Sequence, residues 1–118
     1  MKTHLDTGKT GEELAVKWLL QKGFEIAHRN WRYSYYEIDI VAKKNNRLHF
    51  IEVKCRNAGT IGQPEDSVSK KKFRSLKRAA DAYLQINPHH PWIQYDILAI
   101  KLHAEKEHEF FLLEDVFL

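Results

Sequence analysis

Two short segments that read as β-strands carry acidic side chains where a buried strand would be apolar. They are Glu37-Ile38-Asp39-Ile40-Val41 and Phe50-Ile51-Glu52-Val53-Lys54. Side chains two residues apart on a strand point to the same face of a sheet, so we expect Glu52 and Lys54 side by side. If the two strands are neighbours, Asp39 can join them. The pattern therefore predicts a sheet with two carboxylates and an ammonium on one face.

The rest of the chain predicts an α/β fold around these strands. Apolar residues at helical spacing indicate one helix over about residues 8–21, and a second that begins after Ser67 or Ser69 and ends near residue 86. Alternating patterns indicate strands over residues 24–32, 35–42, 48–56, 92–102 and 109–113. The expected order is α-β-β-β-α-β-β, a mixed sheet flanked by helices, with the second helix as a crossover and with residues 1–118 as one domain.

The two charged strands are expected to form an antiparallel hairpin through the polar turn at residues 43–46. Strand periodicity then predicts the faces: Ile51, Val53 and Cys55 on one face, Phe50, Glu52, Lys54 and Arg56 on the other, and Glu37 and Asp39 opposite Ile38 and Ile40. Each strand should thus turn its branched apolar residues one way and its charges the other.

Composition favours a folded cytoplasmic protein. The chain is 43% hydrophobic, with three Trp, five Tyr and six Phe. No run approaches the roughly 18 apolar residues of a membrane span, and the first residues lack the apolar core of a signal peptide. The single cysteine, Cys55, excludes an internal disulfide and suits a reducing compartment. The basic residues gathered over 70–78 fit either a polyanionic partner or a plain solvated helix face.

The charged strands supply the residue types that phosphodiester hydrolysis needs. Mg²⁺ takes hard oxygen ligands and keeps several waters, so one or two carboxylates suffice. Asp39 and Glu52 fit that role, and the backbone carbonyl of Val53 is a candidate third ligand. Lys54 would orient the attacking water or neutralise charge on the phosphate. Glu12, on the first helix, could reach the same pocket and complete an acidic cluster.

Simpler interpretations of these residues stay open. A charged hairpin face is usually the solvent side of a sheet, and Glu52 could instead pair with Lys54 or Arg56. Leu48 and Phe50 share the charged face, however, which indicates partial burial, and a buried carboxylate needs a cation.

Other candidate sites are weaker. The histidine pair His89-His90 lies between prolines and His103 and His108 flank a charged loop, which argues against a histidine metal site. Cys55 shares the apolar face of its strand, so a structural thiol is favoured over a nucleophile. The aromatic residues Trp31 and Tyr33 to Tyr36 could stack on bases, although aromatics at strand ends are more often core.

The order of motifs along the chain resembles a known family. Asp39, twelve intervening residues and Glu52-x-Lys54 are similar to the PD-(D/E)xK signature of the restriction-endonuclease-like superfamily. Around it occur, in order, Gly8-Lys9-Thr10-Gly11-Glu12, Leu14-Ala15, Trp18-Leu19, Gly23-Phe24, Arg29-Asn30-Trp31-Arg32, Glu37-Ile38-Asp39, Phe50 to Lys54 with Arg56, Gly62, Ser67-Val68 with Lys72, Ala79-Ala80, Tyr83-Leu84 and Tyr95-Asp96. This set resembles the YraN family of small bacterial endonuclease-like proteins, over roughly residues 8–101.

The resemblance implies a restriction-endonuclease-like core, which archaeal Holliday-junction resolvases also use. In that core the metal site would fall on Glu12, Asp39, Glu52 and Lys54. Two departures concern the surroundings of the site. Tyr36 stands where the family usually has glycine, and Gln94-Tyr95 stands where an Arg-Phe pair usually precedes the aspartate.

The sequence therefore predicts an Mg²⁺- or Mn²⁺-dependent nuclease acting on DNA, including branched or flapped forms. The residues expected to grip the nucleic-acid backbone are Arg56, Lys70, Lys72 and Arg74. The alternative is a non-catalytic nucleic-acid-binding or adaptor protein that keeps the fold. Nucleases that cut two strands symmetrically tend to be two-fold dimers, so a homodimer is among the expected assemblies, and no membrane partner is expected.

Overall fold

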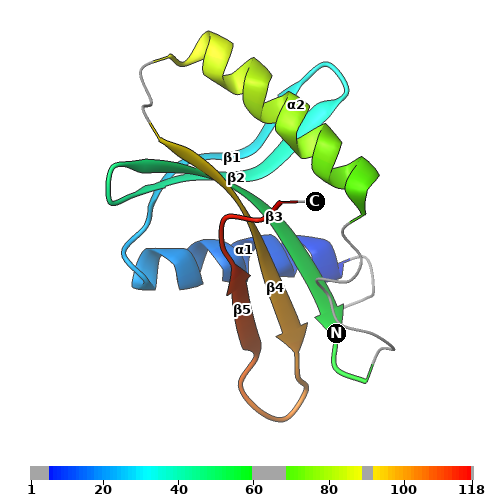
Figure 1. The fold of residues 1–118 in the computed structure, drawn as a ribbon. Helices are drawn as coiled ribbons and strands as arrows, with labels where there is room; N and C mark the ends of the chain where they lie inside the picture. Colours follow the sequence, from blue (N-terminus) through cyan, green and yellow to red (C-terminus); the bar gives the residue numbers. More distant parts are fainter. Residues whose placement is uncertain (1–5, 60–68, 89–91, 118) are drawn as a thin grey trace.

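The chain folds into one five-stranded mixed sheet with a helix on each face (Figure 1). The computed structural model describes residues 6–59, 69–88 and 92–117. Its elements are α1 (Asp6–Gln21), β1 (Glu25–Tyr33), β2 (Tyr36–Lys44), β3 (Arg47–Asn57), α2 (Lys70–Ile86), β4 (Ile93–Leu102) and β5 (Glu109–Leu113). The predicted order α-β-β-β-α-β-β is confirmed, with ends shifted by one or two residues. Neither helix is long and apolar enough to cross a membrane.

The strands follow the order of the sequence across the sheet, β1-β2-β3-β4-β5. Only β3 and β4 are parallel, and they pair along their whole length, from Leu48 opposite Ile93 to Asn57 opposite Leu102. Parallel neighbours need a crossover connection, and α2 makes it. The predicted mixed sheet with the second helix as a crossover is therefore confirmed.

The turn between β2 and β3 works without glycine because asparagine replaces it. Asn45 and Asn46 adopt φ values of 52° and 62°. A two-residue hairpin turn of type I′ requires positive φ at both central residues, and asparagine tolerates that conformation better than most side chains. The predicted hairpin is therefore present, and it aligns Ile40 with Ile51 at the far end of the paired region.

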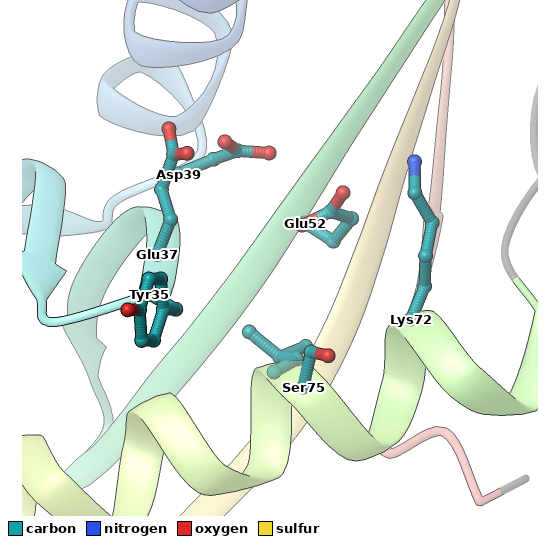
Figure 2. Close-up of a pocket in the computed structure, with 7 residues that line it drawn as sticks. Tyr35, Glu37, Asp39, Glu52, Lys72 and Ser75 are labelled. Atoms are coloured by element: carbon teal, nitrogen blue, oxygen red, sulfur yellow. The ribbon is translucent and has the colours of Figure 1, made fainter.

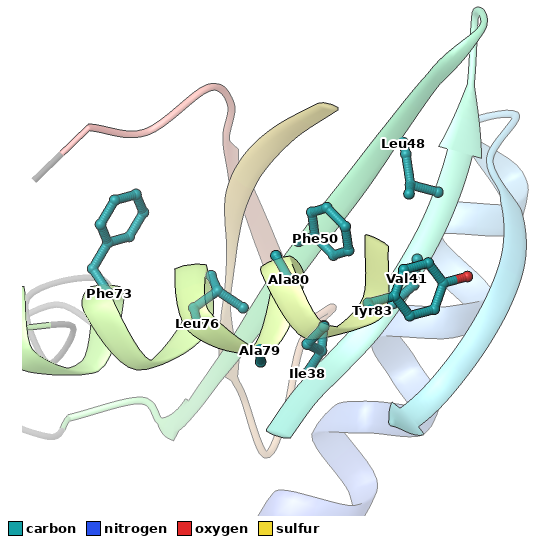
Figure 3. Close-up of a cluster of buried hydrophobic side chains, with 9 residues drawn as sticks. All are labelled: Ile38, Val41, Leu48, Phe50, Phe73, Leu76, Ala79, Ala80 and Tyr83. Atoms are coloured by element: carbon teal, nitrogen blue, oxygen red, sulfur yellow. The ribbon is translucent and has the colours of Figure 1, made fainter. Parts of the chain in front are cut away.

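Each helix covers its own hydrophobic core. The α2 side buries Ile38, Val41, Leu48, Phe50, Phe73, Leu76, Ala79, Ala80 and Tyr83 (Figure 3). The α1 side buries Ala15, Leu19, Phe24, Ile40, Ala42, Ile51, Leu98 and Ile100. Helix α2 is capped by Ser69, whose side chain accepts a hydrogen bond from the Lys72 backbone N–H at 3.2 Å. The alternative cap, Ser67, lies outside the described residues.

One predicted face is wrong, because β2 does not alternate regularly. Ile38 belongs to the core under α2, whereas Ile40 belongs to the core under α1. In a regular strand these two side chains would share a face. The β2–β3 ladder begins only at Ile40, and the Asp39 side chain accepts the Val53 backbone N–H at 2.8 Å. A carboxylate thus takes over a backbone partner where the strands separate, and the strand reverses its faces there.

Candidate functional site

A hollow of about 320 Å³ opens where β2 leaves β3, on the side covered by α2. Its described lining consists of Tyr35, Glu37, Asp39, Glu52, Lys72, Ser75 and Leu76. Figure 2 shows Asp39 and Glu52 on the strand side of the hollow, with Lys72 and Ser75 rising from α2. The fold therefore brings together both predicted acidic ligands and one of the predicted nucleic-acid-binding lysines.

Asp39 is held in a strongly anionic, partly buried position. Its Oδ2 accepts the hydrogen bond from the Val53 N–H. Burial, and then the negative charge of Glu52, raise the pKa of Asp39 to about 7, with smaller contributions from Glu12 and Glu37. The hydrogen bond from Val53 opposes this shift but does not cancel it. A cation beside Asp39 would remove the electrostatic cost of ionising it.

Glu52 and Lys54 lie side by side on β3, as predicted. Lys54 Nζ is 3.5 Å from Glu52 Oε1, and both side chains are largely shielded from solvent. Burial, followed by the contact with Lys72, lowers the pKa of Lys54, while Glu52 acts in the opposite direction. Two lysines, one from β3 and one from α2, thus meet beside the two carboxylates. The simpler expectation of a Glu52–Lys54 ion pair is also met.

Glu12 stands at the edge of this group. Asn30 Nδ2 donates to Glu12 Oε2 at 3.1 Å, and Glu12 contributes to the raised pKa of Asp39 without lining the hollow. Gly11, which precedes Glu12, allows α1 to lie close to β3. A Cβ on Gly11 would lie 2.7 Å from the Cys55 Cβ, so only glycine permits this approach of α1 to β3.

The remaining predicted residues lie outside this lining. Half-buried Arg56 and exposed Lys70 are not among the described residues that line the hollow. Exposed Arg74 lines a second hollow of about 240 Å³ on α2, together with Lys71, Ser75 and Arg78. Ser75 is common to both hollows. The Val53 carbonyl stays a prediction as a third ligand.

Cys55 conforms to the structural role predicted for it. It packs against the core on the α1 side, and burial raises the pKa of its thiol. A raised pKa disfavours the thiolate that nucleophilic chemistry requires.

Three further residues at the site were not predicted as ligands or catalytic residues, although the sequence analysis placed Glu37 on the charged face and named Tyr35 among aromatics that could stack on bases. Glu37 lines the hollow and pairs with Arg32, whose Nη2 lies 3.6 Å from Glu37 Oε1. Asn30 fixes Glu12, and its place in the Arg29-Asn30-Trp31-Arg32 motif was the available signal. Tyr35 lines the hollow although the residue is 98% exposed, whereas aromatics in this segment were expected mostly in the core.

A second polar cluster, also missed, lies at the other end of the β2–β3 hairpin. His49 Nδ1 is 2.7 Å from Asp96 Oδ2, and Asp96 Oδ1 accepts from Gln94 Nε2 at 2.9 Å and from the Asp115 backbone N–H at 3.0 Å. The ring of His49 meets that of Phe24, a core residue on the α1 side. The unusual Gln94 is therefore an internal hydrogen-bonding residue. Its Oε1 also accepts a hydrogen bond from Arg47 Nη1 at 3.0 Å.

This cluster has the composition of a metal site, but its central carboxylate, Asp96, is already engaged by protein groups. Donor atoms of His49, Asp96 and Glu114 lie within 4.8 Å of one another, beside a hollow of about 470 Å³. Both oxygens of Asp96 nevertheless already have protein partners. Elsewhere, His103 and His108 hydrogen-bond within the β4–β5 connection, and His89-His90 lie outside the described residues.

Comparison with known proteins places the chain in a family. Residues 11–100 match the model of the uncharacterised protein family UPF0102. A UPF0102 protein of Bacteroides thetaiotaomicron is 41% identical over 100 residues, covering 85% of this chain and 83% of that protein. One from Flavobacterium psychrophilum is 38% identical over 117 residues, covering 99% of this chain and 98% of its own. The chain therefore belongs to the UPF0102 family, which is the YraN family.

Proposed function

We propose that this protein is a metal-dependent nuclease that hydrolyses phosphodiester bonds of DNA, with Asp39 and Glu52 as ligands of Mg²⁺ or Mn²⁺. The observation that carries the proposal is the position of the Asp39 carboxylate beside Glu52 in a partly buried hollow. Burial and like charge raise the pKa of Asp39 to about 7. Placing two partly buried carboxylates together in this way costs stability, and the single contact of Glu52 with Lys54 leaves Asp39 without an ion-pair partner among the described contacts. A divalent cation would stabilise it.

The donor set fits a hard cation. Carboxylate oxygens are the ligands that Mg²⁺ prefers, and the hollow leaves room for the waters that Mg²⁺ retains. When bound, the metal would activate a water and polarise a phosphate oxygen. Glu12, held by Asn30, would add negative charge from outside the hollow and strengthen the attraction for the cation.

The two lysines supply complementary functions beside the carboxylates. Lys72 lines the hollow from α2 and would attract a phosphate of the substrate into it. Lys54 lies against Glu52 and has a lowered pKa, so its amine can exchange a proton with water more readily than an exposed lysine. It would either orient the attacking water or neutralise charge that develops on the phosphate.

One observation favours the second candidate, a nucleic-acid-binding protein without catalysis. The hollow formed by Lys71, Arg74, Ser75 and Arg78 is basic and independent of the carboxylates. It could hold a phosphate backbone by charge alone. Binding of DNA that depends on Arg74 and Arg78 but not on Asp39 or Glu52 would favour this candidate.

Titration calorimetry with Mn²⁺, combined with cleavage assays, tests the nuclease proposal. The assays would use single-stranded, duplex, flapped and branched DNA, with RNA of the same forms for comparison. We expect wild-type protein to bind Mn²⁺ and cleave at least one DNA form, and Glu52→Ala to lose both. Glu105→Ala, at an exposed acid of the β4–β5 connection, is the matched control. Absence of heat in wild type would overturn the proposal, and binding without cleavage of any form would favour the adaptor.

A further inference from the structure

We propose that Tyr35 is a base-stacking platform at the rim of the Asp39 hollow, and that the substrate carries an unpaired nucleotide beside the phosphate in that hollow. This inference rests on the proposed nuclease function and narrows its substrate class. Tyr35 lines the hollow together with the two carboxylates, yet the residue is 98% exposed. An aromatic side chain exposed to this degree contributes nothing to the core.

The conformation of the β1–β2 turn holds Tyr35 outside the sheet. Tyr33 and Tyr36 form the last pair of the hairpin, so Ser34 and Tyr35 are its two turn residues. Ser34 adopts a φ of 56°, in a position where hairpin turns favour glycine. Strained turn residues persist where the surrounding structure fixes them and are concentrated at functional sites.

A row of aromatic rings fixes the hairpin beneath Tyr35. Trp31 meets the core residue Tyr83 edge-on at 5.2 Å, and Tyr33 stacks on Trp31 at 6.3 Å with an interplanar angle of 9°. Tyr36 also packs against the core on the α2 side. The hairpin is therefore anchored to the same side of the sheet as the hollow, and its tip presents Tyr35 at the rim.

The opposite wall of the hollow carries positive charge and a hydroxyl. Lys72 and Ser75 project from α2 across from the strand carboxylates (Figure 2). Ser75 also lines the adjacent basic hollow, together with Lys71, Arg74 and Arg78. A nucleotide could thus place its phosphate toward α2 and its base toward Tyr35. Aromatic platforms of this type accept any base, because every base has a flat face.

Duplex DNA cannot use this platform, because its bases are already stacked and paired. An unpaired nucleotide in a flap, a gap or a branch point can. Stacking on an aromatic side chain contributes enough free energy that its removal should weaken binding roughly tenfold. The inference therefore predicts a discrimination between paired and unpaired DNA that depends on one side chain.

The test measures binding of fluorescein-labelled 5′-flap DNA and of a fully paired duplex of equal length, with Ca²⁺ to separate binding from cleavage. Tyr35→Ala should weaken flap binding roughly tenfold and leave duplex binding within about twofold, whereas Tyr35→Phe keeps both. Phe117→Ala is the matched control, since Phe117 is 81% exposed and does not line the hollow. With 2-aminopurine as the unpaired base, quenching should persist in Tyr35→Phe and diminish in Tyr35→Ala.

The outcomes separate this inference from the proposed function. If Tyr35→Ala binds flap DNA as tightly as wild type, or loses flap and duplex binding equally, the stacking platform is wrong. Calorimetric binding of Mn²⁺ by Tyr35→Ala, at wild-type strength, would at the same time leave the metal site intact. If wild type binds no Mn²⁺ but shows Tyr35-dependent flap binding, the nuclease proposal fails and the platform stands.

Discussion

Asp39 on β2 and Asp96 on β4 are carboxylates of one sheet that differ in their hydrogen-bond partners and in the charges around them. Asp96 is fully buried, yet both its oxygens have hydrogen-bond partners. Asp39 accepts one described backbone hydrogen bond and otherwise faces Glu52, with Glu12 and Glu37 nearby. Asp96 is satisfied by protein partners, whereas Asp39, whose pKa is raised by burial and by Glu52, is the carboxylate for which we propose a bound cation. The contrast shows that two carboxylates of one sheet can differ widely in how completely the protein itself satisfies them.

Replacing Asp96 with alanine should give the largest effect. The change leaves His49, Gln94 and the Asp115 N–H without their acceptor, and each buried unpaired group is costly. We expect the free energy of unfolding to fall by about 3 kcal/mol, measured by urea denaturation. Glu105→Ala should change it by less than about 0.5 kcal/mol. A loss below about 1 kcal/mol in Asp96→Ala would mean that the cluster is not an anchor.

Asp39→Asn should not destabilise the protein as Asp96→Ala does. The difference in free energy of unfolding between Asp39→Asn and wild type should instead depend on pH. The folded-state pKa of Asp39 is about 7, above the ordinary 3.8, so between these values the folded protein holds a proton that the unfolded chain releases. Wild-type stability should therefore fall as pH rises from about 4 to 7, by roughly 3 kcal/mol relative to Asp39→Asn. The amide oxygen of asparagine can still accept the Val53 N–H. Parallel stability–pH curves for the two proteins would refute the raised pKa.

Manganese should stabilise the protein through Asp39 and not through Asp96. At a concentration tenfold above its Kd, Mn²⁺ should add roughly 1.4 kcal/mol to the free energy of unfolding. The gain should appear above pH 7 and shrink toward pH 5, because protonation of Asp39 competes with the metal. Thermal melts with Mn²⁺ or EDTA measure it. Equal stabilisation of Asp39→Asn, or no dependence on pH, would assign the metal to another site.

The smallest expected effects are those of the neighbouring acids on the pKa of Asp39, and these effects should differ in size from one acid to the next. Glu52 is the strongest charged contributor, followed by Glu12 and then Glu37. Titration of the Asp39 carboxyl by NMR should show the greatest lowering of its pKa in Glu52→Gln, less in Glu12→Gln and least in Glu37→Gln. Stability should change by no more than about 0.5 kcal/mol in Glu12→Gln, since Asn30 can still donate to the amide. An equal response in all three variants would remove Glu12 from the site.

Local patterns in the sequence were sufficient to predict the elements and the central pair. Alternation located the strands, serine capping located the start of α2, and the two-residue period placed Glu52 beside Lys54. These features depend on neighbours in the chain. The juxtaposition of Asp39 with Glu52 followed from the hairpin, because its polar turn is short.

What escaped prediction depends on contacts between distant segments. Strand periodicity gives no sign that Asp39 replaces a backbone partner of Val53 and reverses the faces of β2. His49 and Asp96 meet only because β3 and β4 are parallel neighbours. Tyr35 lies in a segment with other aromatics that do join the core, so only the turn geometry distinguishes it.

The most direct test is the anomalous diffraction of a crystal soaked in Mn²⁺. Carboxylate ligands hold such ions at about 2 Å, so an anomalous peak locates the site without ambiguity. We predict a peak between the carboxylates of Asp39 and Glu52 and none within the His49–Asp96–Glu114 cluster. A peak confined to that cluster, or Asp39 and Glu52 carboxylates more than about 8 Å apart with no density between them, would contradict the account.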